Sequence, residues 1–107
     1  MDATLEKAKT VISEEISRVG YRVNSVLLFG SRAKGEFQSD SDWDFLIVVD
    51  RVMDRETRWG AILAIKRRLA VLKIPNDIIV CSEEAVEEHK DDTGRITYYA
   101  LKEGKPL

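Results

Sequence analysis

Apolar residues recur along the chain with two periods, one helical and one extended. A helical stripe near the N-terminus predicts an amphipathic helix over residues 3–18 that ends at Gly20. It consists of Leu5, Ala8, Val11, Ile12, Ile16 and Val19. A second stripe predicts a helix over residues 55–72, with Asp54 as its N-cap. It consists of Trp59, Ile62, Leu63, Ile65, Leu69 and Leu72.

Short apolar runs between these helices predict three strands. They cover residues 25–29, 44–49 and 77–81, and the last begins with Asp77. Ser82 is placed to cap a short acidic helix, and one more helical turn is expected around residues 99–103. The alternation predicts an α/β or α+β class, with a small sheet covered by helices. We expect a single domain over residues 1–107.

Composition narrows the class of partner and the compartment. The chain has 107 residues, 44% of them apolar and 34% charged, with a net charge of −2. This balance is typical of a globular protein and gives no general attraction to nucleic acid or to an anionic membrane. The basic run at residues 66–68 is expected on the wet face of a helix. No apolar run reaches the roughly 18 residues that cross a bilayer.

One cysteine and one histidine carry little of the expected chemistry. Cys81 excludes an intrachain disulfide, which fits a reducing cytosol, and it reads as a small core residue. His89 stands alone in a charged stretch, so zinc is not favoured. The N-terminal segment contains acids and lacks the apolar core of a signal peptide, so we expect a cytoplasmic location.

The segment "GSRAKGEFQSDSDWDF", residues 30–45, places two carboxylates at the mouth of a buried strand. Because side chains of a strand alternate, Asp42 and Asp44 project to one side and Trp43 to the other. Two carboxylates at ~4 Å repel by about 4 kcal/mol at an effective dielectric constant of about 20. A Mg²⁺ ion relieves this repulsion, and Mg²⁺ shares its shell readily with substrate phosphates.

Three further positions complete a phosphate site. Gly30 permits a close approach of the backbone, and Ser31 offers a hydroxyl and an N–H to an anion. Arg32 adds positive charge beside them. Asp77 heads the third strand, so it reaches the same cation if the strands are neighbours, and it can act as a base toward an attacking hydroxyl.

Each feature alone also fits a simpler structure. A Gly-Ser pair is a common turn, and an Asp-x-Asp pair can cap a helix, bind Ca²⁺ or serve a sugar-nucleotide transferase. The combined order is more restrictive: strand, Gly-Ser, spacer, Asp-x-Asp, strand, helix and Asp-led strand.

That order resembles the minimal nucleotidyltransferases of the DNA polymerase β-like superfamily, whose signature is Gly-Ser, ten residues and Asp-x-Asp. Here ten residues, 32–41, separate Gly30-Ser31 from Asp42-Trp43-Asp44. The resemblance implies a small mixed sheet with helices packed on it. It also implies that Gly30, Ser31 and Arg32 bind nucleotide phosphates. Trp43 stands where the family more often has a smaller aliphatic residue.

The catalytic roles follow from the same resemblance. Asp42, Asp44 and Asp77 would hold two Mg²⁺ ions, and Asp77 would also help activate the acceptor hydroxyl. The implied reaction transfers a nucleoside monophosphate, AMP from ATP, to that hydroxyl. Since a chain of this size has no room for an acceptor-binding domain, we expect the acceptor on a partner. The resemblance implies a tyrosine of a HEPN-type toxin, with this chain as its antitoxin and no direct contact with nucleic acid or membrane.

Three alternatives stay open. The chain could be a sugar-nucleotide transferase that uses the Asp-x-Asp pair and does not need Gly30-Ser31. The chain could neutralise a toxin by occlusion, with a vestigial nucleotide site. It could instead modify a small molecule such as an aminoglycoside.

Overall fold

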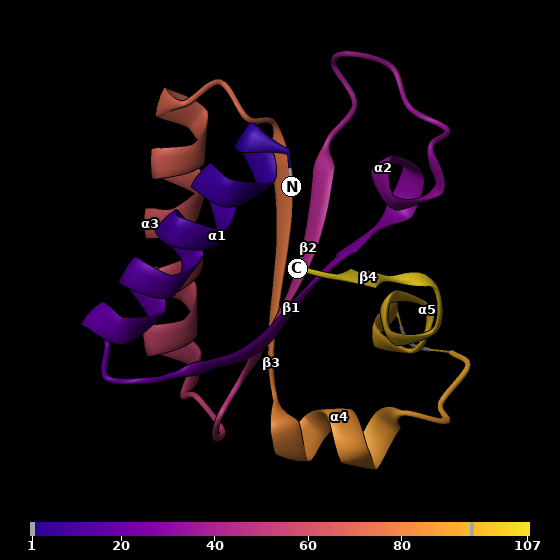
Figure 1. Cartoon of the computed structure of the whole chain (residues 1–107). Helices are drawn as coiled ribbons and strands as arrows, with labels where there is room; N and C mark the ends of the chain where they lie inside the picture. Colours follow the sequence, from indigo (N-terminus) through magenta and orange to yellow (C-terminus); the bar gives the residue numbers. More distant parts are fainter. Residues whose placement is uncertain (1, 95) are drawn as a thin grey trace.

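The computed structural model describes residues 2–94 and 96–107, and Figure 1 shows their arrangement. Four strands and five helices follow one another within this part of the chain. In order they are α1 (Ala3–Arg18), β1 (Val23–Phe29), α2 (Gly30–Lys34), β2 (Trp43–Val49), α3 (Arg55–Val71), β3 (Asn76–Ser82), α4 (Glu83–His89), α5 (Ile96–Glu103) and β4 (Lys105–Pro106).

The strands form one mixed sheet in the order β3-β2-β1-β4. β1 runs antiparallel to both β2 and β4, whereas β2 and β3 are parallel. The parallel pair needs a crossover, which α3 supplies. As a result, the end of β1 and the starts of β2 and β3 meet at one edge of the sheet. The small mixed sheet with packed helices is confirmed.

The main core lies between the sheet and the pair α1 and α3, which Figure 1 shows side by side on one face. The stripe predicted for α1 is largely confirmed, since Ala8, Val11, Ile12 and Ile16 are buried. The stripe predicted for α3 is wrong at its edges. The buried residues of α3 are Ala61, Ile65 and Leu69.

Three of the residues predicted to face the core from α3 are exposed instead, and one of them, Leu72, lies just beyond the end of the helix. Trp59 is 53% exposed and Leu63 is 47% exposed. Their spacing of four residues places them on one face of the helix, beside the buried row. Counting apolar residues therefore made the stripe wider than the face that the sheet covers.

A smaller cluster covers the other face of the sheet. It contains Phe29, Leu46, Val48 and Ala100 of α5. Because β2 sends alternate side chains into both clusters, it is buried on both faces, which explains its uninterrupted apolar run. The last helix begins earlier than predicted, at Ile96, and the short strand β4 was missed.

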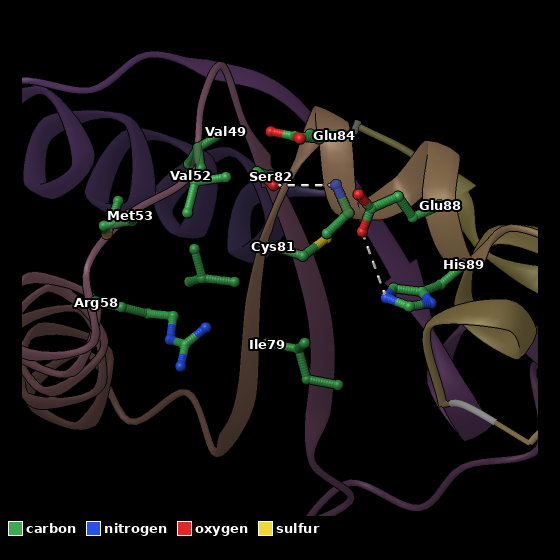
Figure 2. A pocket seen from close by; sticks show the side chains of 12 residues that line it. Val49, Val52, Met53, Arg58, Ile79, Cys81, Ser82, Glu84, Glu88 and His89 are labelled. Carbon is green, nitrogen blue, oxygen red and sulfur yellow. Dashed lines mark hydrogen bonds and ion pairs between the residues drawn. The ribbon is translucent and has the colours of Figure 1, made fainter.

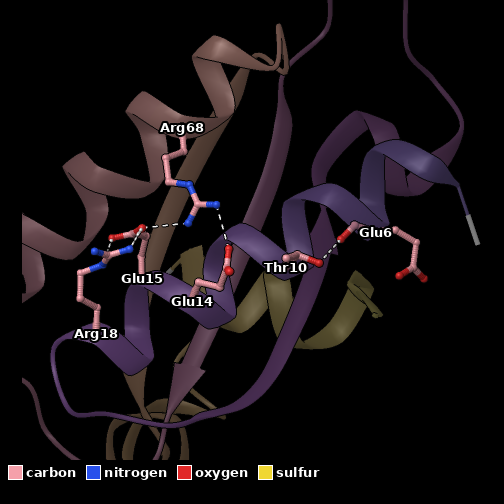
Figure 3. Close-up of polar contacts among 6 residues, drawn as sticks. All are labelled: Glu6, Thr10, Glu14, Glu15, Arg18 and Arg68. Carbon is pink, nitrogen blue, oxygen red and sulfur yellow. Dashed lines mark hydrogen bonds and ion pairs between the residues drawn. The ribbon is translucent and has the colours of Figure 1, made fainter.

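Side-chain caps and charged contacts fix the helix positions. The predicted caps are confirmed: Asp54 accepts a hydrogen bond from the N–H of Thr57, and Ser82 accepts one from Ala85. Arg68 of α3 donates to Glu14 at 2.8 Å and to Glu15 at 2.9 Å, which joins α3 to α1 (Figure 3). Within the basic run at residues 66–68, Arg68 therefore contributes to packing between helices, whereas Arg67 is exposed as predicted.

No helix in the described ranges combines the length and the apolar character needed to span a bilayer.

Candidate active site

Asp44 and Asp77 are direct register partners on the parallel strands β2 and β3. The ladder begins beside them, where the N–H of Trp43 donates to the carbonyl of Pro75 at 2.9 Å. Neighbouring strands lie about 4.8 Å apart, so these carboxylates leave the backbone at closely spaced points. Asp42 precedes β2 and, like Asp77, is exposed. The three acids named from the sequence therefore gather at one edge of the sheet.

The pKa of Asp44 reflects the closeness of the three acids. Burial raises the pKa of its carboxyl above the usual value, and the nearby charges of Asp77 and Asp42 raise it further. The ionised form of Asp44 is thus disfavoured by partial loss of water and by two like charges. A cation placed among the three carboxylates would reverse both effects.

The chemistry of the donors suits a hard cation such as Mg²⁺, which prefers carboxylate oxygens. Among the residues that the structure describes, no group of three or more acidic, histidine or cysteine side chains is arranged so that it could hold a metal ion. Asp42 and Asp77 are exposed, so rotation about their side-chain bonds can bring their oxygens toward Asp44. The donor set fits the ion by chemistry and backbone position.

Gly30 forms the opposite wall of this edge. Its φ of 73° is the left-handed conformation that glycine adopts without penalty. A Cβ atom on Gly30 would collide with the carboxylate of Asp44. Glycine therefore lets the turn after β1 lie directly against the acidic edge. Ser31, half-buried, follows as the second residue of the short helix α2.

Arg32 also lies at this edge, on α2. Its guanidinium donates to the carbonyl oxygens of Ser39 and Ser41 and lies over the rings of Phe37 and Trp43. Phe37 was not among the predicted site residues. The signal that could have revealed it was a single aromatic residue in the polar loop between Gly35 and Asp42.

Lys66 and Asn76 were also missed. The ammonium group of Lys66 donates to the carbonyl of Asn76 at 3.2 Å and to its side-chain oxygen at 3.1 Å. Asn76 directly precedes Asp77, so this contact anchors the start of β3 to α3. Only the position of Asn76 beside Asp77 hinted at such a role.

A pocket of about 500 Å³ lies at the other end of β2 and β3 and is lined by none of the predicted site residues (Figure 2). Val49, Ile79 and Cys81 contribute to its walls. Burial raises the pKa of the Cys81 thiol to about 11, so it stays protonated and poorly nucleophilic at neutral pH. We place the chemistry at the acidic edge, because charged groups converge on Asp44 there.

A comparison with known families identifies the class of protein to which the chain belongs. The nucleotidyltransferase domain family matches residues 5–102, and the chain belongs to that family. No curated protein matches it.

Several solved structures share the fold. A protein assigned as a minimal nucleotidyltransferase is 28% identical, with 100% of this chain and 97% of that chain covered and a TM-score of 0.58. A toxin-antitoxin crystallised with AMP-PNP is 16% identical, with 92% and 70% covered and a TM-score of 0.59. A mutant of the toxin-antitoxin MntA-HpeT is 14% identical, with the same coverage and TM-score. The predicted nucleotidyltransferase fold and the resemblance to minimal members are confirmed.

Proposed function

We propose that this nucleotidyltransferase transfers AMP from ATP to a tyrosine of a HEPN-type toxin and thereby acts as its antitoxin in the cytoplasm. The observation that carries the proposal is the register pairing of Asp44 with Asp77 beside the Gly30 turn. Two similar structures contain toxin-antitoxin proteins, one of them crystallised with AMP-PNP, which supports the choice of partner and nucleotide.

The glycine turn and the three acids would bind different parts of the metal–ATP complex. Gly30 and Ser31 would receive the phosphates of ATP, because Gly30 has no side chain to keep them away. Asp42, Asp44 and Asp77 would hold two Mg²⁺ ions, which supply positive charge to the triphosphate and to the leaving pyrophosphate. The nucleotide would then span the short distance between α2 and the starts of β2 and β3.

Asp77 would also act on the acceptor. Its exposed carboxylate can be reached by a hydroxyl from a second protein. In the transfer step, the tyrosine oxygen forms a bond to the α-phosphorus of ATP while its proton passes to Asp77. The bond from that phosphorus to the bridging oxygen breaks, and pyrophosphate leaves. The protein's contribution is to position these groups and to balance their charge.

The test is incubation with α-labelled ATP, Mg²⁺ and the protein encoded by the neighbouring reading frame. We expect label on a tyrosine of that partner, lost in Asp42→Asn and in Asp44→Asn. The matched control is Asp40→Asn, which removes an exposed acid from the same loop outside the Asp-x-Asp pair. Neutralisation of the toxin without label, unchanged in both site variants, would identify occlusion as the mechanism and overturn the proposal. Label on an added aminoglycoside instead would identify a small-molecule acceptor.

A further inference from the structure

We propose that Arg32 is a positioning residue, which fixes the Asp-x-Asp pair relative to the Gly30-Ser31 turn. The inference rests on the proposed nucleotidyl transfer at this edge. It gives Arg32 a role different from the phosphate contact that the sequence predicts. Three sets of contacts support it.

The first set consists of hydrogen bonds to the loop that leads into β2. Nε of Arg32 donates to the carbonyl of Ser41 at 3.1 Å, and Nη2 donates to the same oxygen at 2.9 Å. Nη2 also donates to the carbonyl of Ser39 at 3.1 Å. Ser41 directly precedes Asp42, so Arg32 holds the backbone at the entrance to the acidic pair.

The second set consists of two aromatic rings. The guanidinium carbon of Arg32 lies 4.5 Å from the ring centroid of Phe37 and 4.2 Å from that of Trp43. Both distances are within the range of cation–π attraction. Trp43 stands between Asp42 and Asp44, so a fixed indole also fixes the backbone that carries both carboxylates.

The third contact is at the other end of the same short segment. Gly30 begins α2 and lies against the carboxylate of Asp44, while Arg32 lies two residues later. α2 therefore touches the start of β2 at two points. Within residues 2–94 and 96–107, no carboxylate lies within ion-pairing distance of Arg32. Its planar guanidinium bonds to carbonyl oxygens and stacks on ring faces at the same time. The ammonium group of a lysine is not planar and cannot make both kinds of contact in this way.

The decisive variant is Arg32→Lys, which keeps the charge but loses the planar fork. For a positioning role we expect kcat to fall at least tenfold while the KM for ATP changes less than threefold. Phe37→Leu, which alters only the distal ring, should lower kcat in the same direction. The double variant should be no slower than Arg32→Lys alone, because both substitutions release one unit. Lys34→Ala, which removes a cation from the same helix, is the control and should keep wild-type kcat.

The fluorescence of Trp43 tests, without any ligand, whether Arg32 holds the indole in place. The chain contains two tryptophans, so Trp59→Phe leaves Trp43 as the only one. In that background Arg32→Lys should shift the emission of Trp43 to longer wavelength and increase its quenching by acrylamide, at an unfolding temperature within a few degrees of the parent.

Two results would overturn the proposal. Unchanged Trp43 emission would show that Arg32 does not hold the indole. A tenfold rise in KM for Arg32→Ala, with unchanged kcat and recovery in Arg32→Lys, would show a phosphate contact instead. If the wild-type chain transfers no nucleotide, the proposed function fails. The emission of Trp43 still decides whether Arg32 holds the indole.

Discussion

Asp44 of β2 and Asp77 of β3 face each other across a parallel ladder, so two acids occupy the same register position of adjacent strands. Such an arrangement costs folding free energy and is retained where function requires it. The raised pKa of Asp44, caused first by burial and then by Asp77 and Asp42, gives this cost a measurable form.

Asp44→Asn should therefore stabilise the fold in the presence of EDTA. For an acid whose pKa rises on folding, the folded state is favoured at low pH, and stability is lost as the pH rises through the folded-state pKa. The asparagine variant, which cannot ionise, should melt a few degrees above the wild type at pH 7. The difference should vanish below pH ~4, near the unfolded pKa. Thermal unfolding followed by circular dichroism measures it, and a lower melting temperature for Asp44→Asn at pH 7 would contradict the finding.

Asp77→Asn should separate the chemical step from binding. If Asp77 accepts the proton of the acceptor, its loss should lower kcat by about 10²–10⁴-fold, the usual contribution of a general base. The affinity for ATP should change much less, since the base acts only in the transition state. Single-turnover transfer and nucleotide titration measure the two quantities. Equal losses in both would assign Asp77 to binding alone.

Gly30→Ala should be more harmful than the same change at the other end of α2. Gly30 and Gly35 both have positive φ values, 73° and 77°, but only at Gly30 would a Cβ meet a side chain, that of Asp44. Backbone strain alone should cost Gly35→Ala about 1–2 kcal/mol. Gly30→Ala adds overpacking, for a total of roughly 2–5 kcal/mol. Urea unfolding provides both values.

A second substitution, at Asp44, tests whether its carboxylate causes the overpacking in Gly30→Ala. Asp44→Ala in the Gly30→Ala background removes the carboxylate and should recover most of the overpacking cost, but none of the backbone strain. A double variant as unstable as Gly30→Ala would show that the carboxylate of Asp44 is not what excludes a side chain at Gly30.

The meeting of the three acids at one edge of the sheet was predictable from the sequence, because they lie at strand starts that the apolar runs reveal. The alternation around Asp42, Trp43 and Asp44 is a local property, and it placed Trp43 on the core side correctly. The pairing of Asp44 with Asp77 required β2 and β3 to be neighbours, which the residues allowed and the family resemblance favoured.

Other features depend on contacts between distant residues, and the sequence could not reveal them. The exposure of Trp59 and Leu63 is decided by how α3 lies on the sheet, since their local spacing suits a buried stripe. β4 contains Pro106 and only two residues, and it exists because its backbone pairs with β1. The contacts of Arg32 were equally hidden, because a loop of several residues brings Ser41 back to α2.

Glu15→Ala should destabilise the fold much more than Glu14→Ala. Both carboxylates accept hydrogen bonds from Arg68, but the side chain of Glu15 is only 7% exposed and also contacts Arg18, whereas that of Glu14 is 53% exposed. Loss of the buried hydrogen-bonded charge should cost roughly 1.5–3 kcal/mol, against about 0–1 kcal/mol for the exposed pair. Urea unfolding of the two matched variants measures the difference. Equal losses would mean that the burial of Glu15 adds no stability to the contacts of Arg68 with Glu14 and Glu15 in Figure 3.

Asp54 should make the stability of α3 depend on pH in the direction opposite to Asp44. Hydrogen bonds from the hydroxyl and the backbone N–H of Thr57 lower the pKa of the Asp54 carboxyl. A lowered pKa stabilises the fold above the unfolded value of about 3.9, and this contribution disappears as the pH falls through the folded-state pKa. Asp54→Ala should thus lower the melting temperature by a few degrees at pH 7 and by less at pH 3. Asp54→Asn, which caps a helix without titrating, should melt near the wild type at pH 7. If the alanine variant lost as much at pH 3 as at pH 7, the cap would owe nothing to the charge of Asp54.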